Sequence, residues 1–127
     1  MKPLAKSKGI MMEEPEYFGP KSFSRESIEH FPELAAELQH DAELLHVQMG
    51  TLALSARTAI QRGDVAFLRR LFAFLDNILA RPKLYYELQN AVETSFLRPA
   101  DFEASQCGRE MWASLPEKLK HALHRAV

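Results

Sequence analysis

Cysteine is almost absent from this sequence of 127 residues, in which Cys107 is the only one. A single cysteine forms no disulfide within the chain, so packing alone must hold the fold, and we expect a reducing compartment. No run approaches the ~20 apolar residues of a membrane span. The basic start is followed by no apolar core of the kind found in signal peptides. These absences predict a cytoplasmic protein that does not engage membranes.

Strand signals are also scarce. No segment alternates with period two over more than a few residues, and β-branched residues are few. Apolar residues instead recur at helical spacing. We predict an all-α fold, an irregular single-domain bundle of about five to six helices. The expected helices cover 24–30, 33–39, 41–62, 64–80 and 83–97, with a last one opening at the sequence Ser-Leu-Pro-Glu from position 114.

The segment 65–80 has the strongest helical pattern. Its apolar residues form two neighbouring stripes, which leave only a narrow polar strip and predict a central, largely buried helix. Phe72 should be among its most buried residues. The preceding Gly63-Asp64 pair predicts a helix end followed by a helix cap. In the helix before it, Leu45 begins a continuous inward stripe with Met49, Leu52, Ala56 and Ala59.

Several local signals set the expected helix boundaries. Ser24 and Asp41 are predicted as N-caps, and Ser114 as the start of a capping box. Gly50, inside a helix, suggests close packing against another helix, since glycine costs up to about 1 kcal/mol there relative to alanine. Residues 1–23 carry four lysines, three prolines and two glycines without periodicity. We interpret them as an N-terminal arm, partly ordered by Tyr17, Phe18 and Phe23, ahead of a helical domain spanning 24–127.

Catalytic motifs are missing. The sequence contains no Gly-x-Ser-x-Gly, no phosphate-binding loop, no Gly-x-Gly-x-x-Gly and no His-Glu-x-x-His. Paired carboxylates for acid–base catalysis are not indicated either. Asp76 and Glu93 do lie on helices with crowded apolar faces, where they should be partly buried. We therefore expect a protein without enzymatic activity and without a cofactor.

Metal binding is the next possibility. The pairs Glu37/His40 and Glu43/His46 both have the Glu-x-x-His spacing of di-iron bundles, but they lie only six residues apart. On a continuous helix they would point about 120° away from each other. His121 and His124 share a face at the chain end, where positive charge suits a helix terminus. We expect no metal site.

Charge is segregated along the chain. Residues 26–56 contain no lysine or arginine, whereas about four would be expected from the chain-wide content, and residues 57–98 carry seven basic against four acidic residues. The net charge of −1 and the sparse basic residues argue against nucleic-acid binding. Two interpretations remain open. In the first, the acidic residues lie at helix starts, where the dipole favours them, and beside the basic surface of the same fold. In the second, they form an acidic face that binds a protein partner. The candidate face comprises Glu26, Glu29, Glu33, Glu37, Asp41 and Glu43.

Four stretches of the sequence resemble a family of small helical bacterial proteins. They are FPEL at 31–34, LLHVQMGTLA at 44–53, LFAFLD at 71–76 and NAVETSFL at 90–97. The resemblance covers about residues 24–125. The family has no assigned activity and includes members that look like immunity proteins of interbacterial toxin systems, so it implies no catalytic residues.

We therefore expect an immunity or antitoxin-like protein that neutralises a cognate bacterial toxin by direct binding. The acidic face would meet a basic surface of the toxin. The alternative is a non-enzymatic helical adaptor or regulatory subunit with another protein partner. The sequence leaves the oligomeric state open.

Overall fold

A computed structural model describes residues 17–40 and 44–125 of the chain. These residues form α1 (Pro20–His30), the 3₁₀ turn η1 (Pro32–Leu34), α2 (Ala35–His40), α3 (Leu45–Arg62), α4 (Val65–Leu79), α5 (Tyr86–Ser95), the 3₁₀ turn η2 (Pro99–Phe102), α6 (Gln106–Ala113) and α7 (Glu117–Arg125). Within them the only β pairing is an isolated bridge between Phe18 and Leu84. The predicted all-α fold is confirmed, with more helices than expected.

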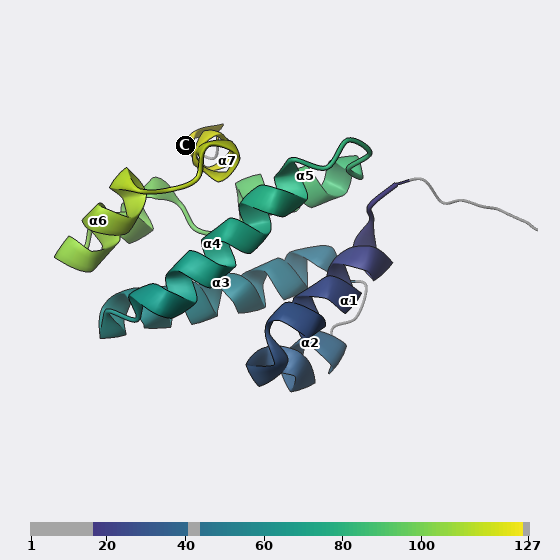
Figure 1. The fold of residues 1–127 in the computed structure, drawn as a ribbon, viewed down its shortest axis with the longest axis horizontal. Helices are drawn as coiled ribbons and strands as arrows, with labels where there is room; N and C mark the ends of the chain where they lie inside the picture. Colours follow the sequence, from purple (N-terminus) through teal and green to yellow (C-terminus); the bar gives the residue numbers. More distant parts are fainter. Residues whose placement is uncertain (1–16, 41–43, 126–127) are drawn as a thin grey trace, which may run out of the picture.

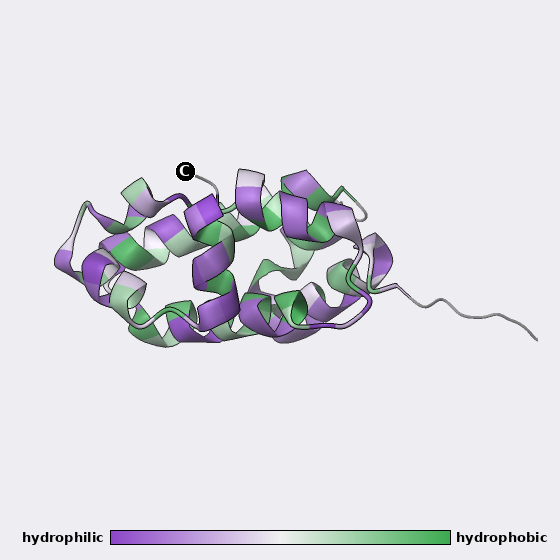
Figure 2. Ribbon diagram, turned by 90° about the horizontal axis from the view of Figure 1, so that it is seen from above, coloured by the Kyte–Doolittle hydropathy of each residue, from purple (hydrophilic) through white to green (hydrophobic). Residues whose placement is uncertain are grey.

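Helices α3 and α4 run side by side in opposite directions through the middle of the molecule (Figure 1). Helices α1 and α2 pack together near one end of this pair, and η2 and α6 pack together near the other. Helix α5 lies along α3, and α7 contacts both α4 and α5. Every helix carries hydrophobic and hydrophilic residues along its length (Figure 2), as amphipathic helices around one core must.

The core is built around α4, as the double apolar stripe predicts. Phe72 is 1% exposed, and its ring meets those of Phe96 and Phe102 at centroid distances of 6.3 and 5.9 Å. The predicted polar strip of α4 is exposed except for Asp76, which is half-buried. The predicted α3 stripe from Leu45 to Ala59 is buried throughout.

The α3–α4 junction is confirmed at both residues. Gly63 has a φ of 70°, in the left-handed region that glycine tolerates without strain. The Asp64 carboxylate accepts a hydrogen bond of 3.2 Å from the backbone N–H of Phe67. This cap satisfies one of the N–H groups left unpaired at the start of α4.

Helix α1 starts earlier than predicted, so Ser24 is not its cap. Pro20 occupies the first turn, where its fixed φ and missing N–H are tolerated. Ser24 is instead buried in mid-helix, and its hydroxyl accepts a hydrogen bond of 2.9 Å from the Gln48 side chain. Phe23, assigned to the arm, lies fully buried in the core. Asp41, the predicted cap of the next long helix, lies outside the described residues, and α3 begins after Leu44.

Helix α5 begins three residues later than predicted because the backbone before it pairs with the N-terminal segment. The Phe18 N–H donates to the Lys83 carbonyl at 2.7 Å, and the Tyr85 N–H donates to the Phe18 carbonyl at 3.0 Å. These bonds hold residues 83–85 out of the helix. Phe18 thereby docks on the body, as expected, while Tyr17 stays 68% exposed.

Two arginines form ion pairs that link the N-terminal elements to α4. Arg70 of α4 binds η1, and Arg81, in the turn after α4, binds α1. Arg81 lies 2.8 Å from Glu26 and also stacks over the Phe18 ring at 4.2 Å. Arg70 lies 3.1 Å from Glu33 and donates to the His30 carbonyl at the end of α1 at 2.8 Å. Arginine suits these positions because its planar fork binds a carboxylate and stacks on rings at the same time. None of the helices in the described part of the chain is long and apolar enough to cross a membrane.

Candidate functional site

The six acidic residues of the predicted binding face do not form one set in the structure. Asp41 and Glu43 lie outside the described residues. Glu26 and Glu33 are paired with Arg81 and Arg70 of the basic segment. The hydrogen bond and charge of Arg70 hold the pKa of Glu33 below its usual value of 4.5. For these two residues, the interpretation that acidic and basic segments neighbour each other is the one that the structure supports.

Glu29 on α1 and Glu37 on α2 remain candidates for partner contact. Both side chains are exposed, and neither forms an ion pair with another described residue. Their charges are therefore available to solvent or to a partner. The acidic face is thus reduced, within the described residues, to these two carboxylates next to the Glu33–Arg70 pair.

An uncharged face of α3 is the most distinctive exposed surface, and sequence reasoning missed it. Leu44, Val47 and Leu54 are 55%, 48% and 63% exposed. Val47 and Leu54 are seven residues apart, so they lie on the same side of the helix. Thr51 and Thr58 share this side and are half-buried. We call the set formed by Leu44, Val47, Gly50, Thr51, Leu54 and Thr58 the α3 face.

Gly50 corrects the expectation of close helix packing. A Cβ atom added to this glycine would have no described atom within 4 Å outside its own helix turn. Gly50 therefore meets no other part of the described chain, and it lies between Val47 and Leu54 on the α3 face. Glycine destabilises a helix relative to alanine. No intramolecular contact among the described residues explains why a glycine stands at this position.

A groove runs beside the α3 face, between the η1 turn and the start of α4. It has a volume of about 370 Å³, and Leu34, Ala59 and Phe67 contribute apolar walls. Glu33, Arg62 and Asp64 line the same groove and provide its charges. The exposed Leu54 side chain also lines it, so the groove and the α3 face are continuous.

His46 lies between a hydroxyl and a carboxylate, an arrangement that the sequence did not indicate. Its Nδ1 is 2.6 Å from the Ser95 Oγ, and its Nε2 is 3.6 Å from a Glu87 carboxylate oxygen. A nucleophile, a base and an acid in this order suggest acyl-transfer chemistry. However, Ser95 ends α5, where helix carbonyls disfavour an oxyanion, and the His46 and Glu87 side chains are 43% and 42% exposed. We interpret the contacts among these three residues as structural, because they link α3 to α5.

The histidines do not gather into a metal site in the described part of the chain. His40 is exposed, and His46 is turned to Ser95. Glu43 of the second predicted pair lies outside the described residues. No group of three or more potential His, Cys, Asp or Glu ligands occurs among the residues that the structure describes.

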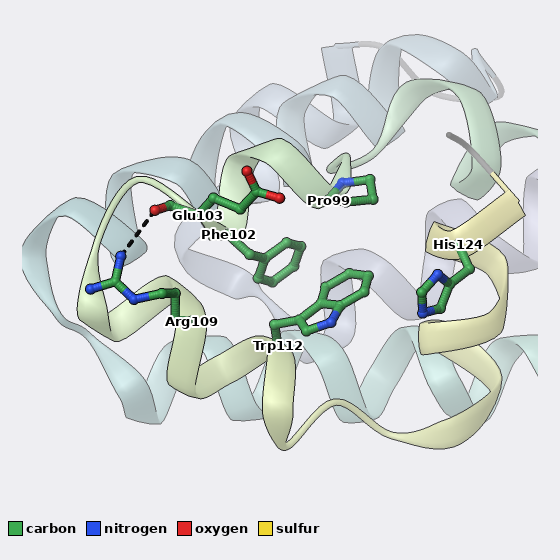
Figure 3. A pocket seen from close by; sticks show the side chains of 6 residues that line it. All are labelled: Pro99, Phe102, Glu103, Arg109, Trp112 and His124. Atoms are coloured by element: carbon green, nitrogen blue, oxygen red, sulfur yellow. Dashed lines mark hydrogen bonds between the residues drawn. The ribbon is translucent and has the colours of Figure 1, made fainter.

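A second hollow, of about 350 Å³, lies between η2, α6 and α7 (Figure 3). We call it the Trp112 pocket. The Trp112 ring stands 5.1 Å from the Phe102 ring and 5.1 Å from the His124 ring, measured between centroids. The remaining lining residues are Pro99, Glu103 and Arg109.

Gly108 determines how closely α6 approaches η2 and so shapes this pocket. A Cβ atom at this position would lie 2.5 Å from the Phe102 carbonyl oxygen, a distance that real contacts do not allow. Only glycine lets the two backbones come this close. The same contact brings Phe102 from one element next to Trp112 from the other.

Comparison with known proteins places the chain in one family. The family model described as a domain of unknown function, DUF7674, matches residues 25–126. Neither the curated proteins nor the solved structures provide a significant match. The matched range includes the α3 face, both hollows and the acidic residues from Glu26 onward. This chain therefore belongs to the DUF7674 family, whose function is not assigned.

Proposed function

We propose that this chain acts by binding a protein partner through the α3 face. The observation that carries the proposal is the combination of three exposed apolar side chains with an unpacked glycine on one uncharged side of α3. Exposed apolar surface that is continuous over a helix face is typical of interaction sites. Burial of these side chains by a partner would contribute favourably at roughly 25 cal/mol per Å² of apolar area.

The position of Gly50 supports a close approach of the partner. Val47 and Leu54 flank it along the helix and would form apolar walls on either side. A glycine between two larger residues lets another backbone or a bulky side chain reach the helix surface. This would explain a residue whose conformational cost has no described intramolecular reason.

The charges beside the α3 face favour a partner with a basic surface. In the groove Asp64 balances Arg62 and Glu33 is paired with Arg70, so the acidic charge beside the face is that of Glu37, which is exposed on the neighbouring α2. Complementary charge around an apolar contact speeds association and selects the partner. Together with the resemblance to immunity-like proteins, this supports a narrower proposal, that the partner is a toxin which the chain neutralises.

Affinity capture with two matched variants tests the binding proposal. Leu54→Arg places a charge on the α3 face, and Ala113→Arg places the same charge on an exposed position of α6. We expect the wild type and Ala113→Arg to retain a protein from a lysate of the source organism, and Leu54→Arg to lose it. Circular dichroism of both variants controls for folding. If quantitative mass spectrometry finds no protein that depends on Leu54, the α3 face is not the binding site.

Expression of the captured protein distinguishes the two functional classes. A toxin should arrest growth when expressed alone and should be tolerated when the chain is co-expressed. The Leu54→Arg variant should then fail to protect. A captured protein that is harmless alone would refute toxin neutralisation and would leave the adaptor or regulatory function, which uses the same surface.

A further inference from the structure

We propose that the Trp112 pocket binds a small quaternary ammonium compound. The pocket shares no lining residue with the α3 face or with the groove beside it, so this binding is separate from the proposed partner binding. Its volume of about 350 Å³ lies within the range of small-molecule sites. Two features of its walls favour a cation, namely the aromatic rings and the position of one carboxylate.

The rings of the pocket stand at steep angles to each other. The Trp112 ring is inclined by 60° to that of Phe102 and by 72° to that of His124. Trp112 is half-buried and His124 is exposed, so a ligand can reach parts of both rings, whereas Phe102 is buried and supports the Trp112 ring. The faces of aromatic rings are electron-rich and attract a cation within about 6 Å, tryptophan most strongly.

The charged group on the inner side of the pocket is the Glu103 carboxylate. Figure 3 shows it on the side of Pro99 and the Phe102 ring. It forms no ion pair with another residue that the structure describes. The Arg109 guanidinium points away from the rings (Figure 3) and donates to the Glu103 backbone carbonyl at 3.1 Å. The carboxylate is therefore available to balance the positive charge of a ligand.

Lys120 shows that the Trp112 ring attracts a cation within the molecule. Its ammonium lies 5.8 Å from the centre of that ring. Lys120 is not among the residues that line the pocket, so this contact leaves the pocket side of the ring to a ligand. The charges of Lys120 and Arg109 oppose a cationic ligand, but salt screens such repulsion at the protein surface.

The apolar walls favour a quaternary ammonium over a primary one. A primary ammonium is a compact, strongly hydrated charge with three N–H donors, and each donor needs an acceptor when the group leaves water. A quaternary ammonium has no N–H donors, and aromatic cages are the usual way in which proteins recognise it. Pro99, Phe102 and Trp112 provide apolar surface for its methyl groups.

Trp112 is the only tryptophan of the chain, so its fluorescence reports on this pocket. The full-length protein is titrated with choline, with its uncharged carbon analogue 3,3-dimethylbutanol, and with ethanolamine, which has the charge without the methyl groups. Free N-acetyltryptophanamide corrects for collisional quenching. We expect a saturable change with choline and binding weaker on the order of tenfold for each of the other two compounds.

Two matched variants assign the charge effect to the carboxylate. Glu103→Gln should weaken choline binding roughly fivefold and leave the affinity for 3,3-dimethylbutanol unchanged, which also shows that the pocket is intact. Glu110→Gln removes the same charge from an exposed residue of α6 that does not line the pocket, and it should bind both compounds like the wild type. The proposal is overturned if choline gives no saturation, if 3,3-dimethylbutanol or ethanolamine binds as tightly as choline, or if Glu103→Gln binds choline as tightly as Glu110→Gln.

Discussion

Three glycines illustrate how differently one residue type contributes to this molecule. Gly63 adopts a positive φ, Gly108 fits under a neighbouring carbonyl, and Gly50 faces open space. The first two are required by the fold, one by backbone conformation and one by contact distance. Gly50 has neither reason among the described residues, which is why we attribute it to partner binding.

Alanine substitutions at the three glycines should therefore have different signs. Gly50→Ala should raise the free energy of unfolding by up to about 1 kcal/mol, because alanine is the better helix former. Gly63→Ala should lower it by about 1–2 kcal/mol through left-handed strain, and Gly108→Ala by about 1–3 kcal/mol through overpacking. Urea denaturation measures all three. A destabilised Gly50→Ala protein would mean that this glycine is needed by the chain itself.

Glu93, predicted to be partly buried, is a half-buried carboxylate that joins α5 to α7. Its Oε2 accepts hydrogen bonds from Gln89 at 3.0 Å and from Arg125 at 2.8 Å. Partial burial raises the pKa of Glu93, but these hydrogen bonds and the charge of Arg125 outweigh it, so the pKa lies below its usual 4.5. The ionised form is thus favoured by folding.

The lowered pKa of Glu93 predicts a loss of stability in acid. Its contribution should be fully present above the unfolded pKa and should disappear as pH falls from about 4.5 through the lower folded value. Glu93→Gln should therefore lose less stability between about pH 6 and about pH 3 than the wild type, by roughly 0.5 kcal/mol. Urea titrations at several pH values measure this. Parallel pH profiles for the two proteins would contradict the prediction.

At the scale of elements, the first turn of α7 is capped by a side chain from another helix. Ser114, the expected cap, is instead the C-cap directly after α6, and its hydroxyl donates to the carbonyls of Glu110 and Met111 at 3.2 and 3.3 Å. The N–H of Leu119 instead donates to the Asp76 carboxylate of α4 at 3.0 Å. A carboxylate at this position also complements the positive end of the α7 dipole.

Removal of this cap should loosen the beginning of α7. We expect Asp76→Ala to cost about 1 kcal/mol, as is typical for lost N-caps. Asp76→Asn keeps a carbonyl acceptor and should cost less. Hydrogen exchange offers the sharpest readout, since the Leu119 amide should exchange faster in the alanine variant. An unchanged Leu119 exchange rate would show that the hydrogen bond does not hold this turn.

At the scale of the whole molecule, the segregated charges of the sequence have two different environments. Some are used within the fold, where Arg70 and Arg81 bind Glu33 and Glu26 and so hold η1 and α1 in place. Glu29 and Glu37, the other two acidic residues of the segment 26–56 that the structure describes, are exposed. Reversal of Glu33 would therefore disturb both folding and binding, whereas Glu29 and Glu37 can be tested separately.

Reversing these two exposed charges should act on association. The variant Glu29→Lys/Glu37→Lys should slow binding to the captured partner, most clearly at low salt, because rim charges mainly affect the on-rate. Its control is Glu103→Lys/Glu110→Lys, which makes the same charge change on two exposed residues, one just before α6 and one within it. Surface plasmon resonance at two ionic strengths measures both. Equal association rates for the two variants would refute the acidic contribution to binding.

The helices and the core could be predicted from the sequence because both depend on local periodicity. The apolar stripes of α3 and α4 repeat every three to four residues, and this repeat by itself indicates which side of each helix is buried. The Gly63-Asp64 junction is equally local, since one residue tolerates a positive φ and the next caps its own helix. All of these features need only residues within a few positions of each other.

Helix starts and exposed surfaces were decided by tertiary contacts. Ser24 lies in mid-helix, where its hydroxyl binds Gln48 of another helix, and the first turn of α7 is capped by Asp76 of α4 in place of Ser114. The α3 face and the Trp112 pocket likewise depend on which neighbours are absent or adjacent in space. The sequence determines that the chain folds as amphipathic helices around α4, because hydrophobic spacing is a local property. Only the tertiary structure decides which polar groups pair and which apolar side chains stay exposed, because those outcomes depend on residues far apart in the chain.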